Sequence, residues 1–516
     1  MIRFLLSAAL ALAVAAFPPR ASAGEGTGAS WAISGELTLE QAVAAALRQN
    51  PDIRKQLQEI ERTRGQIVEV RARALPRVGA NGNFQQQDRR LIEGGSFGAS
   101  SASSGDASPT TTTTAKTGGT TTTTTTTLPV PTSNPAGSSG PGDKSWSVSI
   151  TARQVLYAGG QVRAALKIAK FTEDSSYYQL RDTVDRIIAQ TRVQFYEVLL
   201  SRALITVQEE AVRLLGDALK DQQNRFEAGT VPRFNVLRAE VELSNAQPDL
   251  IRAKNSALIA QLQLAKTLAL DPGPKGQPTF HCVGEFTASE PRLGLTSAIA
   301  AAKEKRAFLK VQRQQILVGK EQIKVALAGY KPRLDASAGY ELRNSRRSDK
   351  LDKIVDGWFF GVTGSWDIFD GLETAGKVQQ ARAQLESAKI NYDDSVQKVE
   401  LEVQQSYANL HAARETIRSQ QKNVEQALEA LRLASERLSA GAGTQLEVLD
   451  ARVALTKART SEIEARAAYN KEVSEFDRVT ATETIYSETF QDPLSERPAP
   501  QTAPAKKPEP ANKKAH

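Results

Sequence analysis

Residues 396–438 read VQKVELEVQQSYANLHAARETIRSQQKNVEQALEALRLASERL, with an apolar residue at every seventh position. These positions are Val396, Val403, Leu410, Ile417, Val424, Leu431 and Leu438. The same spacing occurs 212 residues earlier, at Val184, Thr191, Val198, Ile205, Val212, Leu219 and Phe226. A strict seven-residue period predicts a helix that joins a left-handed coiled coil. The sequence therefore predicts two long coiled-coil helices in one chain.

The residues around these two helices repeat as well. Residues 37–78 align without gaps with residues 293–334, and residues 159–240 align with residues 371–452. The offsets are 256 and 212, and the difference of 44 residues falls in a Gly/Ser/Thr-rich tract, residues 94–144, found only in half one. Because such a composition buries little apolar surface, we expect a mobile loop there.

The sequence patterns of the two halves predict the same order of helices and strands. A helix of roughly 36 residues comes first, at residues 39–74 and 295–330, and a proline follows each one. Two strands with alternating apolar residues come next, at residues 78–84, 146–152, 334–342 and 358–368.

A helix of about 65 residues then begins at Gln161 and again at Glu373. A glycine-containing turn reverses the chain, and a returning helix runs to about Leu270 or Ala481. At about 1.5 Å per residue, the long helix equals the two shorter helices of its half laid end to end. We therefore expect each long helix to pack beside both shorter ones.

The chain ends differ from this repeated core. Arg3, an apolar run and an Ala-Ser-Ala motif at residues 21–23 are typical of an export signal. The predicted organisation is a signal peptide (1–23), a first structural repeat (37–272), a linker (273–292), a second structural repeat (293–482) and a disordered C-terminal tail (483–516).

Composition argues against several classes of protein. A net charge of +8 over 516 residues is scattered along the helices, which argues against nucleic acid as a partner. Cys282 is the single cysteine, so no disulfide can form within the chain. His281 and Cys282 lack the further ligands that a structural metal site needs. We see no nucleophile–base pair and no phosphate-binding loop, and we predict no enzyme, no metal site and no cofactor.

The four strands carry large aromatic residues. Trp146, Trp358, Phe360 and Trp366 alternate with small or polar residues, as in transmembrane β-barrel strands with interfacial aromatics. A soluble antiparallel sheet with one buried face is the alternative. Four strands are too few to close a barrel, and open strand edges are not tolerated in lipid. If the strands lie in a membrane, two, three or four chains would have to share one barrel.

The sequence resembles the TolC family of outer-membrane efflux and secretion channels. The resemblance covers residues 37–481 and rests on the duplicated element order together with short motifs. These are LTLEQA (37–42), LPR (75–77), KPR (331–333), WDIFDG (366–371), and RLSAG (437–441) followed by EVLDA (447–451).

The resemblance implies a mainly α protein with a small β part. It implies a homotrimer, whose chains share a twelve-stranded transmembrane barrel in outer-membrane lipid and whose helices form a periplasmic tunnel. A periplasmic adaptor, or membrane fusion protein, would link the channel to an inner-membrane pump. The Thr-rich tract and the charged tail depart from the family pattern.

Two acidic residues are candidates for the channel gate. Glu447 and Asp450 lie three positions apart on one helical face, where the family has acids that narrow the closed tip. Glu447 also completes a Thr-x-x-Glu capping box with Thr444, so it has a structural reading as well. No helix cap accounts for Asp450. The equivalent residues of half one are Asn235 and Arg238.

The helical turns are candidate adaptor contacts. Gly229, Gly441 and Gly443 permit a positive φ at a tight turn. Together with Thr230 and Thr444 they would form the exposed tips that meet the adaptor. Turn formation alone would also account for these glycines.

We therefore predict an outer-membrane factor of a tripartite efflux pump or a type I secretion system, acting as a passive export conduit. A soluble periplasmic coiled-coil adaptor or scaffold is the alternative. Drug, peptide, protein and metal cargoes are all compatible with this sequence. The sequence also does not identify the pump or the adaptor that the channel would serve.

Overall fold

The computed structural model describes residues 35–86, 114–117, 120–123, 144–270, 280–286, 293–344 and 354–482. The predicted signal peptide, the predicted C-terminal tail and most of the Thr-rich tract lie outside these residues. None of the described helices is both long enough and apolar enough to cross a membrane.

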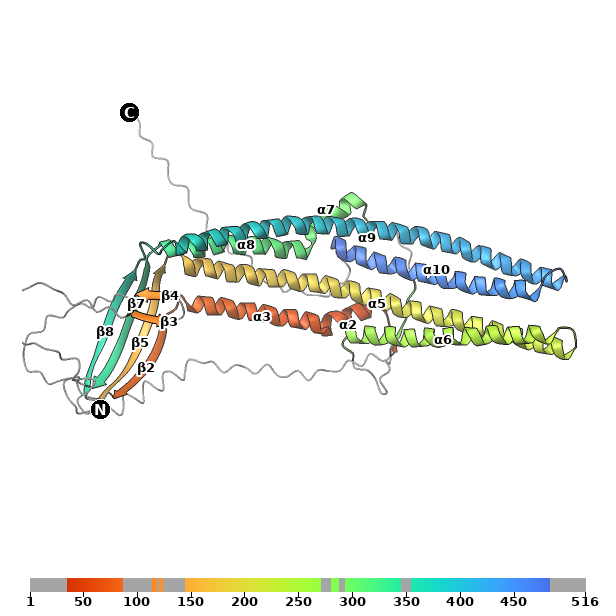
Figure 1. Ribbon diagram of the computed structural model, residues 1–516, viewed down its shortest axis with the longest axis horizontal. Helices are drawn as coiled ribbons and strands as arrows, with labels where there is room; N and C mark the ends of the chain where they lie inside the picture. The colour runs from red at the N-terminus through yellow and green to blue at the C-terminus, as the bar shows by residue number, and fades with distance from the viewer. Residues whose placement is uncertain are drawn as a thin grey trace, which may run out of the picture. The chain divides into compact units, whose positions relative to one another are not determined.

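The two halves contain the same elements in the same order, as the sequence predicts (Figure 1). Half one contains α2 (Leu39–Gln49), α3 (Pro51–Ala72), β2 (Arg77–Gln86), β5 (Lys144–Ala158), α5 (Gln161–Glu227) and α6 (Arg233–Thr267). Half two contains α7 (Leu295–Lys305), α8 (Ala307–Leu327), the short helix η1 (Ala328–Tyr330), β7 (Arg333–Asn344), β8 (Ile354–Ser365), α9 (Glu373–Ser439) and α10 (Gln445–Thr480). Helices α5 and α9 have 67 residues each and begin where the sequence predicts.

The predicted 36-residue helices are each divided in two, so the prediction of one continuous helix is wrong. Asn50 ends α2 with ψ 128°, and Arg306, the equivalent residue, ends α7 with ψ 122°. Pro51 explains the first break, because a residue before proline avoids the helical region. Ala307 follows the second break, and there the Arg306 side chain forms an ion pair with Glu402 of α9.

The described residues fall into two compact units, and helices α3, α5, α8 and α9 run from one into the other. The first unit contains the described residues up to Gly65, those from Ile168 to Lys320 and those from Arg382 onward. The second unit contains the described residues of Gln66–Lys167 and Glu321–Ala381.

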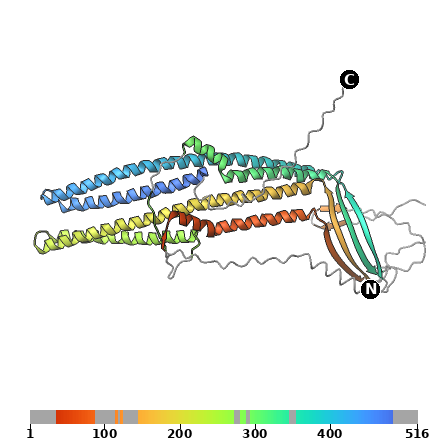
Figure 2. The same ribbon diagram turned by 180° about the vertical axis from the view of Figure 1, so that it is seen from behind.

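The first unit has two apolar cores, one for each half. Helix α6 lies beside α5, and α10 lies beside α9 (Figures 1 and 2). The core of half one includes Leu180, Val184, Phe195, Val198 and Leu264. The core of half two includes Val399, Val403, Leu410, Tyr469 and Phe476. Heptad positions such as Val184, Val198, Val403 and Leu410 thus contribute to both cores, together with residues outside the seven-residue period.

Burial at the heptad positions decreases toward the helical turns. Val198 and Val403 are fully buried, whereas Leu431 and Leu438 are half-buried and Phe226 is 44 % exposed. The seven-residue period continues through all of these positions. The chain by itself therefore leaves the distal part of each apolar seam partly uncovered.

The predicted linker contributes a strand to the core of half one. Strand β1 (Gly35–Leu37) pairs in parallel with β6 (Phe280–Cys282). Leu37, Phe280 and Cys282 are each at most 2 % exposed. Part of residues 273–292 is thus a structural element, which the sequence reading treated only as a connection.

The second unit contains a four-stranded antiparallel sheet in the order β2-β5-β7-β8. The register places Phe84 opposite Trp146 and Val78 opposite Ala152, which confirms the predicted pairing of the first two strands. Strand β5 is irregular between Val155 and Tyr157. Strands β2 and β8 are the edges of this sheet within the described residues.

The Thr-rich tract is described only at two short strands. Strand β3 (Thr114–Thr117) pairs with β4 (Thr120–Thr123) in an antiparallel hairpin. The described part of the tract therefore has secondary structure, which the prediction of a mobile loop did not include. Threonine is β-branched and favours strands, which accounts for these two short ones.

Candidate functional site

One face of the four-stranded sheet is apolar and exposed. The paired positions place Ile150, Tyr340 and Trp358 in one row across three strands, and Ala152, Ala338 and Phe360 in the next. Trp358 is 80 % exposed and Phe360 is 68 % exposed. Such large exposed apolar side chains in adjacent rows indicate contact with lipid or protein rather than with water.

The four predicted interfacial aromatics do not share one environment. Trp358 and Phe360 stand on the exposed apolar face, and Trp146 is half-buried beside Asn344, whose Oδ1 accepts the Trp146 backbone N–H at 2.8 Å. Trp366 lies one residue beyond β8, which ends at Ser365, so the predicted strand 358–368 is too long. The Trp366 indole N–H donates to the Tyr330 carbonyl at 3.1 Å.

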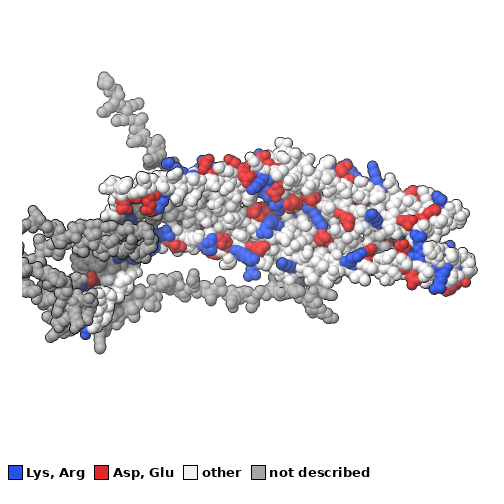
Figure 3. All heavy atoms as spheres, viewed as in Figure 1, with Lys and Arg blue, Asp and Glu red and all other residues white. Residues whose placement is uncertain are grey.

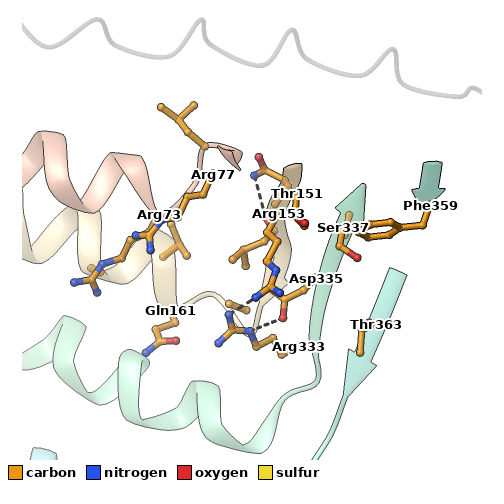
Figure 4. Close-up of a pocket in the computed structure, with 17 residues that line it drawn as sticks. Arg73, Arg77, Thr151, Arg153, Gln161, Arg333, Asp335, Ser337, Phe359 and Thr363 are labelled. Atoms are coloured by element: carbon orange, nitrogen blue, oxygen red, sulfur yellow. Dashed lines mark hydrogen bonds and ion pairs between the residues drawn. The ribbon is translucent and has the colours of Figure 1, made fainter. Parts of the chain in front are cut away.

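The opposite face of the sheet is polar and borders a cavity of about 880 Å³ (Figure 4). Four arginines line this cavity, namely Arg73, Arg77, Arg153 and Arg333, and Asp335 is the one acidic residue among its described lining residues. Figure 4 shows the Arg153 side chain reaching toward Arg333 and Asp335. No sequence pattern predicted this basic pocket, although Arg77 of the LPR motif and Arg333 of the KPR motif contribute to it.

The helical turns form two closely similar tips. Gly229 and Gly441 have φ values of 68° and 70°, as predicted from their positions. The N–H of Thr230 donates to the Arg225 carbonyl at 2.9 Å, and the equivalent N–H of Ala442 donates to Arg437 at 2.8 Å. This bond pattern is the Schellman motif that ends many helices at glycine.

Gly443 differs from the other two glycines of the tips. It is absent from the positive-φ residues of the described chain, so the prediction for this residue is wrong. A Cβ atom at Gly443 would lie 3.0 Å from the Arg437 Cβ and from the Leu438 backbone nitrogen. Glycine is therefore needed here because the chain passes close to the end of α9.

The two candidate gate residues have different surroundings. The Glu447 N–H donates to the Thr444 Oγ1 at 3.3 Å, and the Glu447 carboxylate lies 3.9 Å from Arg437. Asp450 is exposed and has no hydrogen bond or ion pair within the described residues. Thr444 thus caps α10, and its hydroxyl also lies 3.3 Å from the Glu447 carboxylate, but the reciprocal bond of a full capping box is not found among the described residues. A gate role for either acid remains a prediction.

A polar cluster that sequence reading missed lies in the first unit. Arg306 and Arg478 both form ion pairs with Glu402, and Arg478 also pairs with Glu475 at 2.6 Å. These residues come from α9, from α10 and from the break between α7 and α8. The three segments are separated in the sequence. The two halves of the chain are joined nearby, where Arg192 of α5 pairs with Asp477 of α10 at 2.9 Å.

Two carboxyl groups respond differently to this cluster. Burial raises the pKa of the Asp185 carboxyl to about 6, and the nearby Asp182 acts in the same direction against the attraction of Arg181. The Glu402 carboxyl is also partly buried, but hydrogen bonds and charge attraction from Arg306 and Arg478 lower its pKa. The arginines of the cluster therefore keep the Glu402 carboxylate ionised, whereas their weaker attraction does not offset the burial that raises the pKa of Asp185.

No group of three or more potential metal ligands occurs among the described residues. Cys282 is buried in the core of half one, where burial raises the pKa of its thiol to about 12. Lysine, arginine and carboxylate side chains are interspersed over the visible surface of the described helices (Figure 3).

Comparison with known proteins identifies the family. The family model described as outer membrane efflux protein matches residues 42–270 and 298–481, which includes most of both halves. The chain belongs to the outer membrane efflux protein family. This membership confirms the predicted resemblance and the predicted outer-membrane localisation.

Individual relatives of this family are distant in sequence. Protein CyaE of Bordetella pertussis is 23 % identical over 273 residues, which is 52 % of this chain and 56 % of that protein. Outer membrane efflux protein BepC of Brucella suis is 22 % identical over 328 residues, which is 62 % of this chain and 68 % of that protein. The match thus spans little more than half of the length of the Bordetella relative.

The fold is shared with solved outer-membrane channels. The CmeC outer membrane channel of Campylobacter jejuni superposes with a TM-score of 0.68 at 15 % identity, covering 88 % of this chain and 89 % of that chain. The likeness confirms a mainly α fold with a small β part.

Proposed function

We propose that this efflux-family chain is the outer-membrane channel of a tripartite efflux pump or a type I secretion system. Three chains would each contribute four strands to one transmembrane barrel of twelve strands. The helices would form a passive conduit through the periplasm. Specificity for cargo would rest with the inner-membrane pump, which a periplasmic adaptor joins to the channel.

The observation that carries this proposal is the amphipathic sheet, whose edge strands β2 and β8 are open within the described residues. Its apolar face exposes Trp358 and Phe360, whereas its other face carries arginine, serine and threonine. In lipid, every strand edge must be paired, so β2 of one chain would pair with β8 of the next. The partly uncovered heptad seams, including Phe226, supply a second surface for the same neighbours.

A soluble periplasmic adaptor or scaffold is the alternative function. Such a protein would cover its apolar sheet face within its own fold and remain in solution without detergent. Fractionation of membranes followed by mass measurement in detergent distinguishes the two functions. A detergent-dependent particle of three chains supports the channel, and a stable monomer in buffer alone would refute it.

A second experiment tests the proposed gate. Asp450 is exposed and unpaired among the described residues. Three copies of its carboxylate brought together would repel one another and would attract cations. Asp450→Ala should raise single-channel conductance in planar bilayers and weaken block by divalent cations. Glu425→Ala removes another exposed carboxylate, from α9, and serves as control. Equal conductance and cation block in the parent protein and in Asp450→Ala would exclude the acidic gate.

The tips are the proposed adaptor contacts. Thr230 directly follows Gly229, and Thr444 directly follows Gly443; both threonines are exposed, and each side chain makes only local hydrogen bonds. Replacing Thr230 by a bulky tryptophan should reduce adaptor retention on affinity-captured channel. Trimer mass should not change, since the substitution lies outside the sheet and the buried cores.

A further inference from the structure

Equivalent strand positions in the two halves carry different charges at the wall of the basic pocket. Arg77 and Arg333 are equivalent through the offset of 256, and Arg153 and Ser365 are equivalent through the offset of 212. The sheet register places Arg77 directly opposite Arg153, and Arg333 directly opposite Ser365. Half one thus has two arginines at a site where half two has one.

The acidic residue of the pocket forms its ion pair with the arginine of half two. The Arg333 Nε donates to the Asp335 Oδ2 at 2.7 Å, and its terminal nitrogen lies 3.3 Å from the other carboxylate oxygen. The residue equivalent to Asp335 in half one is Gly79. Arg77 and Arg153 form no ion pair within the described part of the chain.

This arrangement is unfavourable unless another charge is present. Like charges on directly opposite residues of a strand pair destabilise the sheet. The pocket lining has four arginines and one aspartate, which leaves an excess of three positive charges. Arg73 is only weakly compensated, because its partner Glu69 lies 3.4 Å away on an exposed helical surface.

The cavity has the size and the donors for a charged ligand. Its volume of about 880 Å³ falls within the range of small-molecule sites. Thr151, Gln161, Ser337 and Thr363 add neutral hydrogen-bonding groups to its wall. Planar guanidinium groups suit phosphate and carboxylate oxygens, which they bind through two parallel hydrogen bonds.

We propose that this pocket binds a multivalent oxyanion, a molecule with at least two phosphate or carboxylate groups, between Arg77, Arg153 and Arg333. The site is formed within one chain, so it goes beyond the proposed channel function and does not depend on it. The anion would arrive as a soluble solute or as the phosphate headgroup of a lipid.

Calorimetric titration of the full-length protein in neutral detergent with inorganic tripolyphosphate tests the proposal. We expect saturable binding of one anion per chain that weakens as salt is added. Arg77→Gln combined with Arg153→Gln should weaken binding by about ten-fold or more, because charge-assisted hydrogen bonds are lost. This double variant also removes the like-charge pair, so it should fold at least as well as the parent.

Gly79→Asp provides the sharpest variant. It copies Asp335 into half one and leaves every arginine in place, and a Cβ at Gly79 would meet nothing within 4 Å. We expect it to weaken tripolyphosphate binding by a similar factor. Arg432→Gln changes the net charge by the same amount on the exposed surface of α9 and should leave binding unchanged.

The lipid source is tested in nanodiscs with and without cardiolipin. If cardiolipin blocks tripolyphosphate in the parent protein, and less in Gly79→Asp, the headgroup is the ligand. If cardiolipin has no effect, the ligand is a soluble anion. The proposal is overturned if tripolyphosphate does not bind, or if Gly79→Asp and the double arginine variant bind it as well as Arg432→Gln does.

Discussion

Asn50 and Arg306 occupy the same position in the two halves, yet they stabilise the same helix break by different means. The Asn50 amide donates to the Thr267 carbonyl at 2.9 Å, and its oxygen accepts the Asp52 N–H at 2.8 Å. Arg306 instead forms an ion pair with Glu402. Half one therefore uses neutral hydrogen bonds where half two uses charge, and duplicated elements can keep their backbone while their interactions diverge.

The largest effect should come from removing the charge at the break of half two. Arg306 is 8 % exposed, so Arg306→Ala would leave the Glu402 carboxylate partly buried with one fewer cation. We expect a loss of about 3 kcal/mol in the free energy of unfolding, measured by guanidinium titration in detergent. Asn50→Ala, which removes only neutral hydrogen bonds, should lose about 1 to 2 kcal/mol.

Lys303→Ala is the control for this comparison. Lys303 also pairs with a glutamate of α9, Glu400, but the Lys303 side chain is 43 % exposed. Exposed pairs contribute about 0 to 1 kcal/mol. A cost for Arg306→Ala no greater than that of Lys303→Ala would mean that the break is held by packing rather than by the buried ion pair.

A second difference between the halves concerns pH. Asp185 of α5 has a pKa of about 6, and the equivalent residue of α9 is the neutral Gln397. Since the unfolded pKa is about 3.9, the folded state holds the proton more tightly. The stabilisation that comes from protonating Asp185 in the folded state is therefore complete below about pH 4, and it is lost as the pH rises through about 6.

Asp185→Asn should remove this loss. At pH 7.5 the variant should be more stable than the parent by about 2 kcal/mol, and at pH 4 the two should be nearly equal. Arg181, Asp182, Arg306 and Arg478 also act on this carboxyl, so the profile must be compared with that of Asp182→Asn. An Asp185→Asn variant that is less stable at pH 7.5 would show that the pair with Arg181 outweighs burial.

The sequence predicted most of the fold because the fold depends on periodic patterns. The seven-residue spacing located α5 and α9, and alternation located β2, β5, β7 and β8, with β8 extended too far toward Trp366. The break at Arg306 left no local signal, since Ala307 permits a continuous helix. The side-chain contact at this break, with Glu402, joins residues 96 positions apart and could not be read locally.

The candidate site was less predictable for the same reason. The Schellman turns at Gly229 and Gly441 are local and were found, whereas Gly443 owes its identity to the approach of Arg437. The pocket arginines became a cluster only once the register placed Arg77 opposite Arg153. By contrast, Asp335 stands only two residues after Arg333 of the KPR motif, so this pair of opposite charges is visible in the sequence.

A smaller effect should separate the two tips. Thr444 caps α10 through its Oγ1, whereas Pro232, at the start of α6, makes no side-chain cap. Thr444→Ala should cost about 1 kcal/mol in the free energy of unfolding. Thr230→Ala should cost less, because it removes only one exposed bond to the Arg225 carbonyl. Equal costs at the two tips would show that the cap is not what distinguishes them.

The smallest effect should come from copying half one into half two at Glu447, whose equivalent is Asn235. Glu447→Asn keeps the N–H that donates to Thr444. It removes a carboxylate near the helix start, which accepts a hydrogen bond from the Thr444 hydroxyl at 3.3 Å and forms a weak 3.9 Å pair with Arg437. We expect a loss of about 0.5 kcal/mol, since both interactions are exposed. Channel conductance should change less than in Asp450→Ala, because the Glu447 carboxylate already interacts with Thr444 and Arg437. If Glu447→Asn raises conductance as much as Asp450→Ala does, both acids act at the gate and the difference between the tips is functional as well as structural.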